Sequence, residues 1–234
     1  MCMAALTLAI GTAVQAQNRQ FYQSVYLNGN IPTGQFASDA APNQLALYGV
    51  PLGYKEIGKD AAAGFGLGYR ASFRFDVGVG QVAPFFNADF LWNTIGGGWS
   101  DKYSDAKQSK PTYFNIPAML GVSYLNDRLP WNAITGYLEF GLGTDLLWIT
   151  SEGDHSNYPK LSYKPDFAFA WMSGLGAYFG HDQLFSAGIY YYGLGKHEIA
   201  YTSGTIERLR TSEELLPTER RTVGSVMLRL GFHF

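Results

Sequence analysis

The chain has 234 residues, of which 47% are hydrophobic, 16% aromatic and only 15% charged. Soluble domains carry about 25% charged residues, so this composition indicates a large apolar surface. The mean hydropathy is nevertheless −0.08, and beyond residue 16 no apolar run approaches the roughly 18 residues of a transmembrane helix. The formal net charge of −2 provides no basic field for nucleic acid. These features argue against a helical membrane protein and against a nucleic-acid-binding protein.

Residues 1–16 form a short apolar segment that ends in the small-residue pattern Val14-Gln15-Ala16. This pattern is typical of a secretory signal peptide cleaved before Gln17, although its basic beginning is missing, so we expect the true start to lie upstream. A short buried strand or helix is the alternative. The only cysteine, Cys2, lies inside this segment, so the mature chain would have no disulfide, thiolate metal site or cysteine nucleophile.

Residues 64–78 show the clearest pattern in the chain. Their odd positions, from Phe65 to Val77, are all apolar, while their even positions are glycine, serine or charged residues. A strict period of two predicts a β-strand whose two faces meet different environments. The pattern alone does not decide which face meets the solvent.

The same alternation predicts seven further strands, over residues 19–29, 82–93, 112–126, 134–150, 165–180, 183–195 and 221–234. The register of the seventh strand in chain order is ambiguous at Tyr190-Tyr191-Tyr192. Long polar connections cover residues 31–62, 94–111, 151–164 and 196–220, and short ones cover 79–80, 127–132 and 181–182. Long and short connections therefore alternate.

This alternation predicts an all-β fold, an eight-stranded antiparallel up-and-down transmembrane β-barrel over residues 17–234. Such barrels have short periplasmic turns and long extracellular loops. A soluble β domain with these aromatics in its core is the alternative, but it would not need long loops at one end only.

The chain ends in Leu228-Arg229-Leu230-Gly231-Phe232-His233-Phe234, an alternating strand with a terminal aromatic residue. With its eight alternating strands and four Gly-Leu-Gly repeats, it resembles the small outer-membrane barrels of Gram-negative bacteria, in particular the porin-family barrels of Bacteroidetes. The resemblance implies an outer-membrane location and contact with outer-membrane lipid and lipopolysaccharide. It also implies that Phe232 and Phe234 are read by the barrel-assembly machinery. It implies little about chemistry.

The barrel model places one set of charged side chains inside. These are Arg70, Arg74, Asp76, Asp89, Glu139, Asp145 and Arg229, with Arg221 as a further candidate. An eight-stranded barrel is just wide enough to be filled by side chains, so we expect these charges to pair with one another. A charged constriction or a small binding cavity among the inward glycines is the functional alternative.

The opposite face of each strand would meet lipid in the predicted barrel. Trp92, Trp148 and Trp171 would form the outer aromatic girdle, and the periplasmic girdle would contain Tyr124, Phe179, Phe232 and Phe234. A charge placed at Phe73, taken as near mid-membrane, should be tolerated worse than alanine at Ser72.

No residue set predicts catalysis, a cofactor or a metal site. Asp154-His155-Ser156-Asn157 places a base beside a hydroxyl, but in a loop without a rigid platform. His181 looks like a turn residue, His197 like a strand-end or loop residue, and His233 like an inward residue at the periplasmic end; none has metal-ligand spacing. Residues 211–214 match a capping box that could begin a short helix.

Three functions follow from this sequence. The leading one is a non-enzymatic outer-membrane barrel that acts as a structural anchor or presents its loops to an extracellular partner. The second is a narrow pore or small-molecule binder that uses the charged, glycine-lined interior. The third is a hydrolase that acts on membrane lipid.

Overall fold

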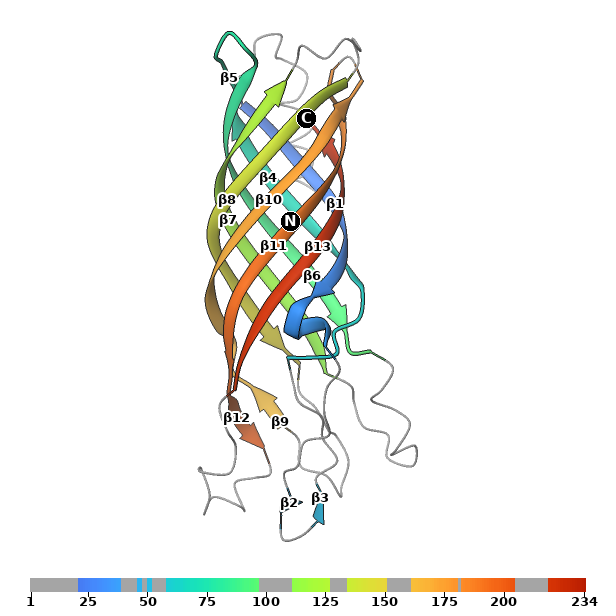
Figure 1. Cartoon of the computed structure of the whole chain (residues 1–234), viewed down its shortest axis with the longest axis vertical. Coiled ribbons are helices and arrows are strands. Elements are labelled where there is room, and N and C mark those ends of the chain that lie inside the picture. The colour runs from blue at the N-terminus through green and yellow to red at the C-terminus, as the bar shows by residue number, and fades with distance from the viewer. Residues whose placement is uncertain are drawn as a thin grey trace, which may run out of the picture.

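A computed structural model of the chain describes residues 21–38, 46–47, 50–51, 58–96, 111–126, 134–150, 161–180, 182–204 and 219–234. Within these residues, eight long strands form one closed antiparallel barrel (Figure 1). They are β1 (Phe21–Thr33), β4 (Gly64–Phe73), β6 (Gln81–Thr94), β7 (Thr112–Asn126), β8 (Ile134–Ile149), β10 (Asp166–Phe179), β11 (Phe185–Ile199) and β13 (Glu219–His233). The predicted fold class is confirmed.

Shorter elements extend this barrel. The two-residue strand β5 (Phe75–Asp76) continues β4 along the edge of β6. Beyond the other end of the barrel, β9 (Leu161–Tyr163) pairs with β12 (Tyr201–Gly204), and β2 (Ala46–Leu47) pairs with β3 (Val50–Pro51). No helix among the described residues is long and apolar enough to cross a membrane.

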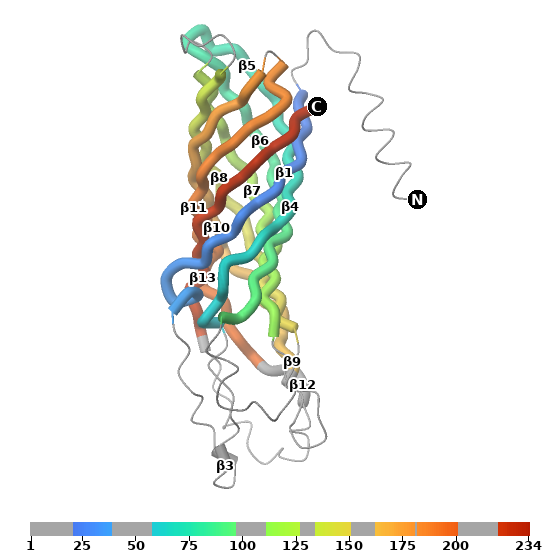
Figure 2. The backbone as a smooth tube through the Cα atoms, turned by 90° about the vertical axis from the view of Figure 1, so that its right-hand side faces the viewer, coloured from blue at the N-terminus to red at the C-terminus, as the bar shows by residue number. Residues whose placement is uncertain are grey.

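The barrel closes along the seam between β1 and β13, which lie side by side in Figure 2. Their register runs from Ser24 opposite His233 to Thr33 opposite Gly224. Beyond the last ladder pair, the backbones of Gln23 and Phe234 exchange two hydrogen bonds of 3.1 and 2.9 Å. Closure satisfies the backbone groups that an open sheet edge would leave unpaired in lipid.

The two faces of each strand differ as the alternation predicts. On β4, the side chains of Leu67 and Phe73 are 60% and 50% exposed on the outer wall, whereas Arg70 is 2% exposed inside. The ambiguous register of β11 resolves with Tyr191 outside and both Tyr190 and Tyr192 inside. A soluble protein would bury the apolar set, so this arrangement excludes the soluble alternative and matches a barrel that lies in lipid.

Aromatic side chains gather on the outer wall toward the end of the barrel that carries the long connections. Phe114 on β7 packs against Trp92 at 6.1 Å and against Trp148 at 5.2 Å between ring centres. Trp171 contacts Tyr191 at 5.3 Å. Toward the short-turn end, Tyr124, Phe179 and Phe232 are also exposed on the outside.

Several strand boundaries differ from those predicted by the sequence periodicity. β1 runs to Thr33, past the predicted end at residue 29, and β11 runs to Ile199, past residue 195. The predicted strand over residues 64–78 is interrupted at Arg74, between β4 and β5. These extensions take residues from the predicted loops into the barrel wall.

Phe73 does not lie in the middle of its strand. It is the last residue of β4 and pairs with Phe21, the first residue of β1 in the described part of the chain. Its ring lies 4.8 Å from that of Phe21, at the short-turn edge of the outer wall. The strand that was predicted to run to residue 78 ends five residues earlier, so Phe73 stands at its end and we expect it to lie nearer the membrane interface.

The chain that follows β1 packs against the barrel at the end with the long connections. The 3₁₀-helix η2 (Gly34–Ala37) buries the ring of Phe36 to 1% exposure, 5.1 Å from the ring of Tyr113. Ala61 donates its backbone N–H to the carbonyl of Phe36 at 2.9 Å, and the Tyr113 hydroxyl donates to the carbonyl of Lys59 at 3.0 Å. Part of the connection between β1 and β4 thus packs against this end of the barrel, where Figure 1 shows η2.

Candidate functional site

The candidate site is the polar interior of the barrel, whose centre is the ion pair of Asp89 on β6 and Arg229 on β13. Arg229 Nη2 lies 3.1 and 3.0 Å from the two carboxylate oxygens of Asp89. Asn28 and Asn87 donate to the same carboxylate at 2.9 and 2.6 Å, and the Tyr192 hydroxyl donates at 2.8 Å. The carboxylate is therefore fully hydrogen-bonded, which a buried charge requires.

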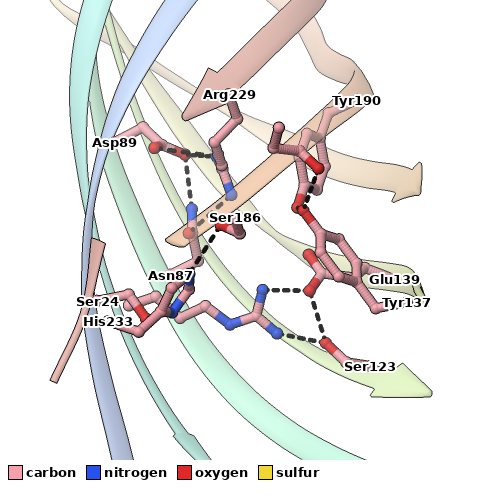
Figure 3. A network of polar contacts seen from close by, with 12 residues as sticks. Ser24, Asn87, Asp89, Ser123, Tyr137, Glu139, Ser186, Tyr190, Arg229 and His233 are labelled. Carbon is pink, nitrogen blue, oxygen red and sulfur yellow. Dashed lines mark hydrogen bonds and ion pairs between the residues drawn. The ribbon is translucent and has the colours of Figure 1, made fainter. Parts of the chain in front are cut away.

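Arg229 is satisfied from its other sides as well. Its Nε donates to Asn28 Oδ1 at 3.0 Å, and its guanidinium lies 4.6 Å from the ring centre of Tyr26 and 4.4 Å from that of Tyr190. Figure 3 shows this group beside Asn87 and Asp89. All these side chains point inward from β1, β6, β11 and β13, so they fix four strands to one another.

A second pair joins β4 to β8. Arg70 forms an ion pair with Glu139 and donates to the Ser123 hydroxyl, which itself donates to Glu139 Oε1 at 2.8 Å. The Arg70 guanidinium also lies 3.9 Å from the ring centre of Phe85. Both charged side chains are almost fully buried, and Figure 3 shows Glu139 between Ser123 and Tyr137.

A third group lies toward the long-connection end, where His197 on β11 sits between two carboxylates. Its Nε2 lies 3.1 Å from Asp145, and its Nδ1 lies 3.3 Å from Asp166. Sequence periodicity missed this inward histidine because the pairing of β11 with β13 shifts at Gly195. That glycine adopts φ +94°, which a β-bulge with a left-handed residue requires.

His233 occupies the short-turn end of the interior. Its ring nitrogens lie 2.6 Å from the Ser24 hydroxyl and 2.7 Å from the Ser186 hydroxyl, as Figure 3 shows. A histidine next to a serine is one half of a hydrolytic arrangement. Here, however, both serines are inside the wall, with Ser24 2% and Ser186 4% exposed. The arrangement therefore ties β1, β11 and β13 together and offers no surface to a substrate.

Two of the predicted interior charges behave differently. Asp76 is exposed, outside the network, and accepts a 2.7 Å hydrogen bond from the Gly78 N–H in the turn. Even-numbered residues of β4 point into the barrel, but the strand breaks at Arg74, so this alternation does not continue to Asp76. Arg74 is buried but has no carboxylate partner among the described residues; it donates to Gln183.

The remaining predicted charges lie inside. Asp89 pairs with Arg229, Glu139 with Arg70, and Asp145 with His197. His155, His181, the capping box over 211–214 and the signal peptide over 1–16 fall outside the described residues. Within the described ranges, no group of histidine, cysteine and acidic side chains could hold a metal ion.

Two central glycines have no room for a side chain of their own on the inner face. A Cβ built on Gly68 would collide with the carboxylate of Asp89, and one on Gly174 would collide with the ring of Tyr190. The glycines therefore make room for side chains that the barrel already contains. The interior also holds Tyr113, Leu91 and Met119, none of which is exposed.

The closed wall, the apolar exterior and the paired charges inside define an outer-membrane β-barrel of eight strands. No protein-family model matches the chain, and the search of curated proteins gave no match. The narrower resemblance to the porin-family barrels of Bacteroidetes stays a prediction.

Three solved structures are similar to this chain in fold. Neisserial surface protein A is 14% identical with a TM-score of 0.43, over 92% of this chain and 98% of that one. OprG from Pseudomonas aeruginosa is 15% identical with a TM-score of 0.45, over 92% and 94%. Ail of Yersinia pestis, solved with the heparin analogue sucrose octasulfate, is 12% identical with a TM-score of 0.41, over 92% and 100%. At these identities the likeness concerns the fold alone.

Proposed function

We propose that this protein is a non-enzymatic outer-membrane barrel with a filled interior, which anchors its connections at the cell surface for structure or for binding. The observation that carries the proposal is the interior itself. Arg70 and Arg229 each have a buried carboxylate partner, and the space around them holds tyrosine rings. Because these charges already neutralise one another, the interior offers no unpaired charge to attract an ion.

Planar-bilayer conductance of the refolded protein tests the filled interior against a narrow pore. We expect no discrete openings from the wild-type chain. Ion-selective openings that disappear in Asp89→Asn or Glu139→Gln would show that the network lines a conducting path, and would overturn the proposal. Gel mobility must show the same folded fraction for the variants as for the wild-type chain.

A hydrolase acting on lipid is the enzymatic alternative, and Ser186 with His233 is the pair that it would need. Because Ser186 is buried inside the wall, we expect the lipid A and phospholipid profiles of cells that overexpress the protein to match those of cells that express Ser186→Ala. A new deacylated lipid that appears with the wild-type chain alone would contradict this expectation.

The proposal assigns each partner inferred from the sequence to one part of the protein. The apolar outer wall would meet outer-membrane lipid and lipopolysaccharide, and the connections would meet an extracellular partner. Phe232, 44% exposed on the outer wall, and Phe234 would be read by the barrel-assembly machinery.

Phe234→Ala should lower the folded amount in cells while leaving refolding from urea into detergent unchanged. Equal losses in both assays would mean that Phe234 only stabilises the barrel.

A further inference from the structure

A groove runs across the outer wall of the barrel, over the adjoining strands β1, β13, β11 and β10. Its volume is about 860 Å³, within the roughly 300–1,000 Å³ of small-molecule sites. Leu27, Leu230, Leu175 and Ile189 belong to its lining, and each of these side chains is more than half exposed. The groove is therefore an accessible cavity, open to the medium that surrounds the barrel.

Small outward side chains form the floor of this groove. Ala187 of β11 and Ala177 of β10 lie opposite each other in the ladder between the two strands. Along β11, the outward neighbours of Ala187 are the large, exposed side chains of Phe185 and Ile189, and Ala177 has equally large neighbours on β10. The two alanines thus lie in a depression that has a wall on each side.

Gly29 of β1 extends the depression, and it differs from the inward glycines of the barrel. A Cβ built on Gly29 would meet only Leu228, at 3.9 Å, which is ordinary contact. A Cβ on Gly66 or Gly176 would instead lie 2.5 Å or less from a backbone carbonyl oxygen. Packing requires glycine at those two positions but not at Gly29, so the missing side chain of Gly29 leaves open space on the outer wall.

The groove faces the hydrocarbon of the membrane. Along β10, Ala177 is two residues from Phe179, toward the short turns, and six residues from Trp171, toward the long connections. The floor is therefore part of the same wall that lipid covers on either side of it. In lipid, association depends on van der Waals packing, and an unfilled hollow loses contacts along its whole lining.

We propose that this groove binds one acyl chain of a phospholipid from the periplasmic leaflet. The floor at Ala177 lies near the short turns, which face the periplasm in barrels of this type. Phospholipid forms that leaflet of an outer membrane, whereas lipopolysaccharide forms the outer one. A chain in the groove touches side chains on three sides, so it makes more contacts than a chain on a flat part of the wall. The inference rests on the outer-membrane location and not on a filled interior.

Methyl NMR of the whole chain tests the proposal, with the protein refolded in deuterated detergent micelles and its alanine methyl groups labelled. The matched control is Ala88, which points outward on β6, on the opposite side of the barrel. The two signals are assigned by their loss in Ala187→Leu and Ala88→Leu. Dipalmitoyl phosphatidylethanolamine should shift the Ala187 signal saturably, with cross-relaxation from the chain methylenes, at lipid-to-detergent ratios that leave Ala88 unchanged.

Two variants that add the same side chain separate the groove from the rest of the wall. Ala187→Leu occupies the floor, so the phospholipid ratio at half saturation, followed at the Ala177 methyl group, should rise about tenfold. Ala88→Leu makes the same change on the opposite side and should leave this curve as it is in the wild-type chain. Heat-modifiable gel mobility shows that both variants are folded.

Three results would overturn the proposal. Equal shifts at Ala187 and Ala88 would mean that lipid solvates every part of the wall alike. Saturation by lipid A at ratios where the phospholipid has no effect would assign the groove to the other leaflet. Shifts that follow protein concentration without lipid would assign it to a second copy of the chain. None of these results bears on conductance, so a silent barrel with equal shifts would refute this inference and leave the proposed function in place.

Discussion

At the scale of single residues, Asp89 shows how a buried charge is satisfied by several partners at once. Asp89 accepts hydrogen bonds from Asn28, Asn87 and Tyr192 in addition to its ion pair with Arg229. Removing its charge would leave a guanidinium inside the barrel with neutral groups alone. Replacing a buried pair on both sides is far less costly than breaking it on one side.

Asp89→Asn should therefore lower the free energy of unfolding by about 3–5 kcal/mol, measured by urea titration of the refolded protein in detergent. The asparagine side chain matches the aspartate in size, so packing changes little. The matched control is the double variant Asp89→Asn with Arg229→Met, which should recover part of the loss because it removes the unpaired cation. If the two residues were not coupled, the losses of the two single variants would add in the double variant. A double variant whose loss equals that sum would contradict the prediction.

At the scale of one element, β4 shows how depth in the membrane sets the cost of a charge. Leu67 lies on the outer wall between Leu27 of β1 and Phe90 of β6, whereas Phe73 is the last residue of the strand. They are six positions apart, about 20 Å along the strand. The two positions therefore sample different depths on the same lipid-facing side.

Leu67→Arg should cost about 2–4 kcal/mol and Phe73→Arg about 0–1 kcal/mol, because a charge near the bilayer midplane loses more hydration than one at the interface. Unfolding by denaturant in lipid vesicles measures both, and Ser72→Ala, inside the barrel, provides a substitution that adds no charge to the wall. Equal costs at Leu67 and Phe73 would contradict the assigned depths.

How far the sequence predicts an element depends on whether its period is regular. The alternation over β4 and β13 places Arg70 and Arg229 inside, and the structure pairs both with carboxylates. The period fails where the backbone departs from regular pairing. The bulge at Gly195 turns His197 inward, and the break at Arg74 turns Asp76 outward. Partners across the barrel, such as Asp89 with Arg229, depend on register and curvature, which period two does not encode.

At the scale of the whole molecule, the barrel depends on one seam between the two ends of the chain. Leu230 of β13 pairs with Leu27 of β1 on one side and with Ala187 of β11 on the other. β13 thus closes the wall between β1 and β11. An opening there would expose unpaired backbone groups to lipid, at several kcal/mol for each group.

Leu230→Pro should therefore prevent closure, whereas Leu230→Ala should not. Proline removes a backbone N–H donor from the seam, while alanine keeps the N–H and loses only an outward side chain. In unheated gels, we expect the wild-type chain and Leu230→Ala to migrate as a compact band that shifts on heating, and Leu230→Pro to migrate as the unfolded chain does. A compact band from Leu230→Pro would show that β1 and β13 stay paired without the complete ladder, so that the seam is not what holds the barrel closed.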